Sequence, residues 1–202
     1  RQARVRVLLG LRRHVLGLAA GEPLDREVPA GEDDRRVTVL RVVTTLGSTV
    51  WLTSIVVVGA LVLRRAGRIR ALVFLVATSA AGSALNLSVK YLVSRDRPSV
   101  EEPVATAVGH SFPSGHAMGS TVVYGALLVV FLRLAPRERR GWIVGAAVLL
   151  VAAIGFSRLA LGVHYITDVL AGFALGLAWL SASSAAFRLW QEERREEGEP
   201  AA

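Results

Sequence analysis

Long uncharged stretches alternate with short charged segments along this chain. Five of these stretches are bounded by charged or histidine residues and are rich in Val, Leu, Ala and Gly: 42–63, 71–89, 117–132, 141–157 and 169–187. A helix crosses the hydrocarbon core of a bilayer with about 20 predominantly apolar residues, in a usable range of about 17–25. The third stretch is the shortest, but Leu134 and Ala135 extend it and Arg133 is able to snorkel. The pattern therefore predicts an all-α, polytopic transmembrane helix bundle with five spans.

The loops between the stretches indicate the orientation of the bundle. Two of these loops carry four arginines each: Arg64, Arg65, Arg68 and Arg70 in the first, and Arg133, Arg137, Arg139 and Arg140 in the other. Together with a charged tail over residues 188–202, they fall on one face. The positive-inside rule assigns that face to the cytoplasm. We therefore expect a multi-pass protein of the cell membrane whose segments 90–116 and 158–168 share the extracytoplasmic face.

The first 41 residues fit this scheme poorly. Residues 3–21 are apolar and basic together, too short and too charged to span, and are predicted to form an interfacial amphipathic helix. Residues 21–36 are predicted to form a polar loop. This arginine-rich segment falls on the extracytoplasmic side, against the rule that set the orientation, and a missing sixth span upstream would explain the conflict. The predicted organisation is an N-terminal segment over 1–41, a transmembrane domain over 42–187 and a cytoplasmic tail over 188–202.

Composition narrows the possible functions. The formal net charge is +8, and Lys90 is the only lysine among 24 basic residues. Because the arginines gather in short loops between apolar runs, they fit membrane anchoring rather than nucleic-acid binding. The absence of cysteine excludes disulfides and thiolate metal sites. The single lysine draws attention to position 90, where a compact ammonium differs from a guanidinium fork.

The first polar segment, KYLVSRDRPSV, follows the second apolar stretch. Lys90 and Arg97 are seven residues apart, or two helical turns, and so would share a face of a helix that ends near Arg97. Pro98 disfavours helical geometry at Arg97, which places the predicted helix end there. Arg95 is predicted to point elsewhere and to pair with Asp96. By themselves, these cations favour the simpler interpretation of a helix C-terminus at the lipid headgroups.

The second polar segment, HSFPSGHAMGS, precedes the third apolar stretch. Pro113, Ser114 and Gly115 are predicted to form a turn, with a helix starting near His116. Such a turn offers backbone N–H groups and a hydroxyl to an anion. His116 is then a candidate proton donor beside the anion. An ordinary capped helix start is also compatible with the pattern, and His110 carries only a weak indication of direct chemistry.

The third polar segment, SRLALGVHYITD, lies between the last two apolar stretches. His164 and Asp168 are four residues apart and are predicted to meet on one face of the helix that begins there. A carboxylate behind an imidazole fixes its tautomer and leaves its other nitrogen as a nucleophile or base. Arg158, six residues before His164, is able to face the same point. A His–Asp pair that stabilises a helix start is the structural alternative.

Taken together, the three segments indicate a phosphate site. They supply cations, backbone N–H groups and two histidines to one membrane face, and the predicted phosphate ligands are Lys90, Arg97, Arg158 and the Ser114–Gly115 turn. Fixed cations and amides stabilise the charge on a transferring phosphoryl group. One histidine attacks phosphorus and the other protonates the leaving oxygen. Because no carboxylate cluster is available for a two-metal site, we expect neither a metal nor a cofactor.

In order and spacing these motifs resemble the signature of the type 2 phosphatidic acid phosphatase (PAP2) superfamily over roughly residues 42–187. The signature reads Lys-x6-Arg-Pro, then Pro-Ser-Gly-His, then Ser-Arg-x5-His-x3-Asp, and this chain matches it with Lys90 and Arg97-Pro98, with Pro113-Ser114-Gly115-His116, and with Ser157-Arg158, His164 and Asp168. The resemblance implies that His164 is the nucleophile, forming a phosphohistidine, with Asp168 supporting it and His116 as general acid. It implies that the phosphate ligands are Lys90, Arg97, Ser114, Gly115 and Arg158. Membrane members commonly have six helices, one more than the pattern shows here.

The substrate implied by this resemblance is a lipid phosphate or diphosphate whose tails stay in the bilayer. Phosphatidic acid, phosphatidylglycerol phosphate and undecaprenyl diphosphate all fit, and the motifs do not choose among them. The alternatives are a membrane protein that binds lipid phosphate without turnover, a small transporter with a His164–Asp168 proton relay, and a vanadate-dependent haloperoxidase-like enzyme. The haloperoxidase relatives are soluble, whereas this chain has a mean hydropathy of +0.47.

Overall fold

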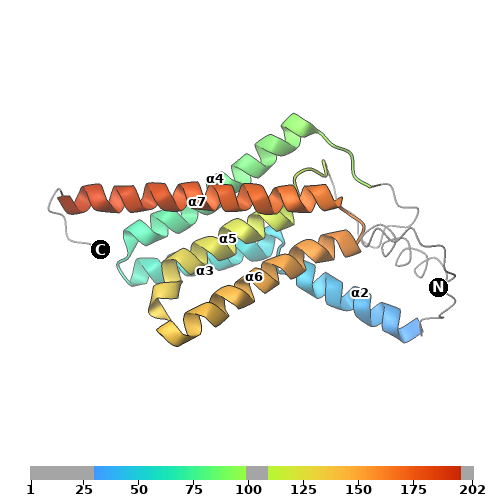
Figure 1. The fold of residues 1–202 in the computed structure, drawn as a ribbon, viewed down its shortest axis with the longest axis horizontal. Helices are drawn as coiled ribbons and strands as arrows, with labels where there is room; N and C mark the ends of the chain where they lie inside the picture. The colour runs from blue at the N-terminus through green and yellow to red at the C-terminus, as the bar shows by residue number, and fades with distance from the viewer. Residues whose placement is uncertain (1–29, 99–108, 197–202) are drawn as a thin grey trace.

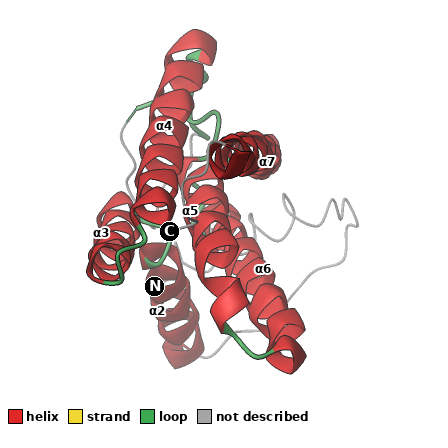
Figure 2. Cartoon of the chain, turned by 90° about the vertical axis from the view of Figure 1, so that its left-hand side faces the viewer, coloured by secondary structure: helices red, strands yellow, loops and turns green. Residues whose placement is uncertain are grey.

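The computed structural model describes residues 30–98 and 109–196, which form an all-α transmembrane bundle without a strand among the described residues (Figures 1 and 2). In chain order the helices are α2 (Ala30–Thr45), α3 (Thr49–Arg65), α4 (Ile69–Val93), α5 (Gly115–Phe131), α6 (Arg137–Ala160) and α7 (Ile166–Glu196), with a 3-10 turn at Leu132–Leu134. Four of the helices, α4 to α7, are long and apolar enough to cross a membrane, α5 together with that 3-10 turn. The predicted fold class is thus confirmed, and the third span extends to Leu134 but not to Ala135.

The first predicted span, 42–63, is not one straight helix. Arg35–Thr45 and Thr49–Arg65 form a pair bent by 43°, which makes a fifth span if the pair counts as one. The break lies where Ser48 adopts an extended conformation and its hydroxyl accepts a hydrogen bond from the N–H of Trp51, an N-cap that starts α3 afresh. The predicted polar loop is also wrong in its last part, because α2 begins at Ala30. The predicted amphipathic helix over 3–21 lies outside the described residues.

Two other helix ends differ from the predicted ones. The helix α4 ends at Val93 rather than near Arg97, because Ser94 takes a left-handed conformation with φ of 48°. Such a conformation is a common way for a helix to end. At the other end of the chain, α7 continues to Glu196, so the predicted boundary at 187/188 falls within a helix, as the boundary at 41/42 falls within α2. The three-part domain organisation stays a prediction.

The helix α5 lies at the centre of the bundle and packs most extensively against α7 and α4. Two glycines one turn apart on α7 allow the first of these contacts. A Cβ on Gly172 would lie 2.8 Å from the carbonyl oxygen of Ser114, and one on Gly176 would lie 2.8 Å from Cβ of Thr121. Small residues of this kind let two helix backbones approach closely. The glycines therefore bring the start of α7 against the start of α5.

The bundle has a polar region at each of its two ends, where the segments that connect the helices lie. Figure 1 shows that the chain leaves α4, enters α5 and passes from α6 to α7 at one end, whereas α3–α4 and α5–α6 are joined at the opposite end. The three polar segments of the sequence thus meet at one end of an apolar bundle. The arginine-rich loops lie at the other.

Candidate active site

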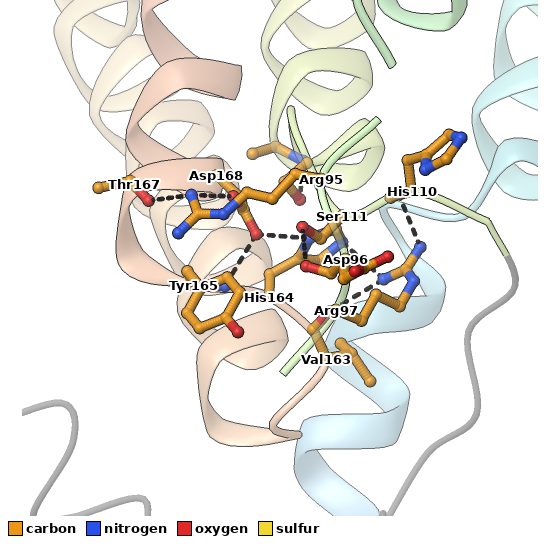
Figure 3. Close-up of polar contacts among 12 residues, drawn as sticks. Arg95, Asp96, Arg97, His110, Ser111, Val163, His164, Tyr165, Thr167 and Asp168 are labelled. Carbon is orange, nitrogen blue, oxygen red and sulfur yellow. Dashed lines mark hydrogen bonds and ion pairs between the residues drawn. The ribbon is translucent and has the colours of Figure 1, made fainter. Parts of the chain in front are cut away.

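Backbone hydrogen bonds connect the three polar segments to one another. The N–H of Ser111 donates to the carbonyl oxygen of Arg95 at 2.8 Å. The hydroxyl of Ser111 donates to the carbonyl oxygen of Asp96, also at 2.8 Å. The N–H of Ser114 donates to the carbonyl oxygen of Asp168 at 2.9 Å. Figure 3 shows the resulting cluster, in which side chains from distant parts of the sequence face one another. The fold therefore brings together the residues that the sequence had placed in separate motifs.

Arg97 reaches the cluster from the irregular segment after α4, not from a helical face shared with Lys90. Its Nε and Nη2 donate to the carbonyl oxygens of Gly109 at 2.8 Å and His110 at 3.3 Å. Its Nη1 donates to the carbonyl oxygen of Val163 at 2.9 Å and lies 3.5 Å from Nε2 of His164. Lys90 and Arg97 therefore do not share a helical face, and Arg97 lies beside His164 because of the path of the irregular segment.

Lys90 occupies the last turn of α4, where its ammonium is held by the next segment. Its Nζ donates to the carbonyl oxygen of His110 at 2.8 Å, and its Cε lies 4.0 Å from the position of a Cβ on Gly115. The lysine therefore lies beside the first turn of α5. His110 contributes a carbonyl oxygen to both Lys90 and Arg97, while its ring stands edge-on to Tyr91 at 6.2 Å between centroids.

Arg158 is the most deeply buried of the three predicted phosphate cations, with 7% of its surface exposed. Its Nη1 donates to the hydroxyl of Thr44 on α2 at 2.8 Å. Its Nε is buried and has no hydrogen-bond partner. A buried guanidinium donor without a partner is costly, because desolvation removes its water and nothing replaces it. An anion in the cluster would satisfy it.

The helix α5 begins at Gly115, close to the predicted start at His116. The hydroxyl of Ser114 caps the helix by accepting from the N–H of Ala117 at 3.5 Å, so this side chain is engaged in the helix start. The following N–H groups, of Gly115 and His116, belong to the first turn and have no intrahelical acceptor. His116 packs against Gly47, whose Cβ position lies 3.2 Å from Cδ2 of the ring. This helix start therefore presents backbone donors and a histidine to the cluster.

His164 lies in the turn before α7 rather than on the helix, which corrects the predicted shared face. Its Nδ1 is 3.4 Å from Oδ2 of Asp168 but is not aligned for a hydrogen bond. The same Oδ2 accepts a hydrogen bond from the N–H of Tyr165 at 2.9 Å, so Asp168 also caps the start of α7. The carboxylate thus stands behind the imidazole and also stabilises the start of α7.

The environment keeps the imidazole of His164 neutral. Burial, followed by the charges of neighbouring groups, lowers its pKa from 6.5 to about 2, and those groups are Arg97, Arg158, Lys90 and His116. Burial also lowers the pKa of Arg97, and the charge of Asp168 acts in the opposite direction. Each named neighbour is close enough to act on His164 electrostatically. In the resting state, therefore, Nε2 of a neutral ring faces a group of cations.

Three contacts at the site were not predicted from the sequence. Arg95 does not pair with Asp96; its Nη1 donates to Oδ1 of Asp168 at 3.0 Å. Ser111 joins two segments and Thr44 holds Arg158 from a helix 114 residues away in sequence. Arg95 and Ser111 lie within the first two polar segments, but their spacing gives no reason to connect them to the residues that they contact. Thr44 lies outside the three segments, and all three contacts join separate parts of the chain.

Metal ligands do not gather at the site. Among residues 30–98 and 109–196, no group of three or more His, Cys, Asp or Glu side chains is placed to hold a metal ion. The expected independence from metals and cofactors stays a prediction.

Comparison with known proteins finds relatives that are named as lipid phosphatases. Phosphatidylglycerophosphatase B of Bacillus subtilis (strain 168) is 40% identical over 96 residues, which is 46% of each chain. A lipid A 1-phosphatase of Rhizobium johnstonii is 45% identical over 75 residues, 37% of this chain and 27% of the relative. A decaprenylphosphoryl-5-phosphoribose phosphatase of Mycolicibacterium smegmatis is 39% identical over 87 residues, 42% of each chain. The chain spans less than half the length of these curated relatives.

The fold has a counterpart among solved structures. The crystal structure of a transmembrane PAP2 type phosphatidylglycerolphosphate phosphatase from Bacillus subtilis superimposes with a TM-score of 0.66, covering 92% of this chain and 96% of that one at 23% identity. The likeness at this identity concerns the fold. The family model of the PAP2 superfamily matches residues 70–192, which is more than half of the chain and includes all three motifs. This chain therefore belongs to the PAP2 superfamily.

Proposed function

We propose that the protein is an integral-membrane phosphatase that removes phosphate from a lipid phosphate or diphosphate through a phosphohistidine at His164. The observation that carries the proposal is the convergence of cations on Nε2 of His164, with Arg97 Nη1 at 3.5 Å and with Arg158 and Lys90 within electrostatic reach. A phosphate placed among them would satisfy the buried Nε of Arg158. Its charge would also be stabilised as the transition state forms.

The first step is attack on phosphorus by the lone pair of Nε2. The pKa of His164, lowered to about 2 by burial and by the nearby cations, keeps this lone pair free at neutral pH. A phosphorus–nitrogen bond forms while the bond from phosphorus to the lipid oxygen breaks. The ring becomes positively charged, and its Nδ1 proton faces Oδ2 of Asp168 at 3.4 Å. Asp168 then stabilises the imidazolium.

The second step returns the enzyme to its starting state. His116, in the first turn of α5, is protonated when the negative charge of the bound phosphate offsets the surrounding cations. It gives this proton to the lipid oxygen as that oxygen leaves in the first step, and in the second step it takes a proton from water. The activated water attacks phosphorus, the phosphorus–nitrogen bond breaks, and inorganic phosphate leaves. Each step uses only groups of this chain, the substrate and one water.

A groove beside the site favours a lipid substrate. It has a volume of about 640 Å³, is lined mainly by apolar residues of α3, α4 and α5, and extends from Gly115 at the site to Arg64 near the opposite end of the bundle. Leu52, Val56 and Val122 are among its lining residues. A hydrocarbon chain lying in it would leave its phosphate beside the first turn of α5. The names of the relatives, which all describe phosphatases acting on lipids, agree with this substrate class.

The arginine-rich loops support an extracytoplasmic active site, because basic loops favour the cytoplasm. The chain has no cysteine, so single cysteines report topology without background. A cysteine replacing Ala66 should react only with reagents that reach the cytoplasm, and one replacing Asp96 should react from outside. The opposite labelling pattern would place the site inside the cell.

The test of the function is release of phosphate by the purified protein from a panel of lipid phosphates. The panel contains phosphatidic acid, phosphatidylglycerol phosphate and undecaprenyl diphosphate, with His164→Ala as the inactive variant. We expect turnover of at least one substrate and a base-stable, acid-labile phosphoenzyme that His164→Ala lacks. Label trapped equally in His164→Ala would refute the nucleophile. Binding of a lipid phosphate without release would favour a binding or transport protein instead.

A further inference from the structure

Arg95 lies between Lys90 and Arg97 in the sequence. Its side chain faces Oδ1 of Asp168, whereas His164 lies near Oδ2 of the same carboxylate (Figure 3). Its Nη1 donates to Oδ1 of Asp168 at 3.0 Å and to the hydroxyl of Thr167 at 2.7 Å. Its guanidinium carbon lies 4.3 Å from the ring centroid of Tyr165, within the range of a cation–π contact. The carboxylate of Asp168, the hydroxyl of Thr167 and the ring of Tyr165 therefore fix the guanidinium of Arg95 in one orientation.

Asp168 requires such a partner. Its side chain is fully buried, with 0% exposed, and a buried carboxylate is tolerated only when it is paired and hydrogen-bonded. His164 is neutral at rest and does not supply the compensating charge. Arg95 does, since a guanidinium stays charged throughout the pH range of an enzyme.

The division of the two carboxylate oxygens is equally informative. Oδ1 accepts from Arg95, whereas Oδ2 accepts from the N–H of Tyr165 and faces Nδ1 of His164. Contacts on both oxygens prevent the carboxylate from rotating. Without Arg95, Oδ1 would lose its charged donor, and the plane of the carboxylate would no longer be set against the imidazole.

We propose that Arg95 is a positioning residue of this active site, which acts through Asp168 on the tautomer of His164. By holding Asp168, Arg95 keeps the ring proton on Nδ1 and the lone pair on Nε2, where the phosphorus is attacked. It does not bind phosphate. The role in turnover rests on the proposed function, whereas the effect on the tautomer does not.

Kinetics provide the first test. Arg95→Gln should lower kcat roughly tenfold to hundredfold, as loss of an outer partner of a functional histidine commonly does, with KM near the wild-type value. Arg95→Lys should restore part of the loss, because it keeps the charge but not the planar fork. Asp96→Asn is the matched control, because Asp96 is the neighbour of Arg95 in the sequence and is exposed. This substitution should leave kcat unchanged. A loss carried by KM alone would mean that Arg95 contacts substrate, and would overturn the proposal.

A double-mutant cycle separates positioning from a general loss of structure. If Arg95 acts through Asp168, then Arg95→Gln added to Asp168→Asn should lower kcat little further. Full additivity would overturn the proposal.

The tautomer of His164 can be measured without turnover, so this test does not depend on the identity of the substrate. Nitrogen-15 spectra of histidine-labelled protein contain four side chains, and His164→Gln identifies the resonances of His164. We expect a ring protonated on Nδ1 in the wild type and in Asp96→Asn, and a mixture of tautomers in Arg95→Gln. An unchanged tautomer in Arg95→Gln would refute the role of Arg95, whereas absence of phosphatase activity in the wild type would refute the function alone.

Discussion

The two polar ends of the bundle both carry clustered cations, yet only one of them has the geometry of a site. At the end with the joined α3–α4 and α5–α6 helices, the arginines are mostly exposed: Arg64, Arg65, Arg68, Arg133, Arg137 and Arg139. At the other end Arg158 is buried, while Lys90 and Arg97 are half-buried and held by carbonyl oxygens. The difference lies in burial and in fixed partners, not in charge.

This comparison explains why the number of cations is a poor guide to function. An exposed cation is screened by water and salt and contributes little to any single interaction. A cation held in a water-poor pocket acts on its neighbours much more strongly. At His164 burial is the largest cause of the lowered pKa, and the charges of the surrounding cations lower it further. Removing a buried, fixed feature at the site end should therefore change activity or stability more than removing an exposed counterpart elsewhere.

The largest effect is expected at Lys90. Losing one charged contact to a transition-state oxygen costs about 3 kcal/mol, so Lys90→Ala should lower kcat/KM on the order of a hundredfold. Lys90→Arg should restore only part of this, because a planar fork replaces a compact ammonium beside Arg97. Arg139→Ala removes an exposed cation from the opposite end and should leave kcat/KM unchanged. Equal kinetics for all three variants would remove Lys90 from the site.

The close approach of α5 and α7 should be sensitive to one methyl group. A Cβ on Gly172 would lie 2.8 Å from the carbonyl oxygen of Ser114, so Gly172→Ala should destabilise the protein by about 1–3 kcal/mol through overpacking. Gly145→Ala on α6, where no atom lies within 4 Å of the new Cβ, should preserve or raise the melting temperature. Thermal unfolding in detergent measures both. Similar melting temperatures for the two variants would contradict this account of the packing.

The neutral state of His164 makes stability depend on pH. Because its pKa falls from 6.5 to about 2 on folding, the unfolded state binds more protons between these values, and stability is lost as the pH falls below about 6.5. The stability lost through this titration reaches on the order of 2 kcal/mol at about pH 5. His164→Gln abolishes it, so the melting temperature of the variant relative to the wild type should rise as the pH falls from about 8 to about 5. A difference independent of pH would show that His164 does not titrate in this way.

The anchoring of Arg158 should have a smaller effect. Thr44→Val removes the hydroxyl that accepts from its Nη1 at 2.8 Å. Since a hydrogen bond contributes about 0.5–1.5 kcal/mol, kcat/KM should fall by roughly twofold to tenfold. Thr45→Val is the control, because the hydroxyl of Thr45 donates locally to the carbonyl oxygen of Arg41. If both variants keep full activity, Thr44 does not position Arg158.

No effect is expected from chelation of metals. With EDTA present, phosphate release should remain unchanged, because the proposed chemistry uses cations of the chain in place of a metal. Vanadate should inhibit, as a mimic of five-coordinate phosphorus among these cations. Activity lost in EDTA and restored by Mg²⁺ would refute the metal-free mechanism.

Local patterns in the sequence determined the helices and the contents of the site. Five apolar stretches predicted the bundle because burial in a bilayer demands length and hydrophobicity, both of which are local properties. The three motifs identified the residues that the fold brings together, including Lys90, His116 and His164. They were selected by the chemistry that a phosphate site would need, which requires no knowledge of the chain's path.

Tertiary structure alone decided the partners of those residues. The helix α4 ends at Ser94, so Arg97 reaches the site along irregular backbone and Arg95 turns to Asp168, 73 residues away, instead of to its neighbour Asp96. Thr44 meets Arg158 across 114 residues, and the groove beside Gly115 exists only between packed helices. The sequence gives the charge and the hydrogen-bond donors of each side chain. Which acceptor lies within about 3 Å of a donor depends on the backbones that the packing brings together.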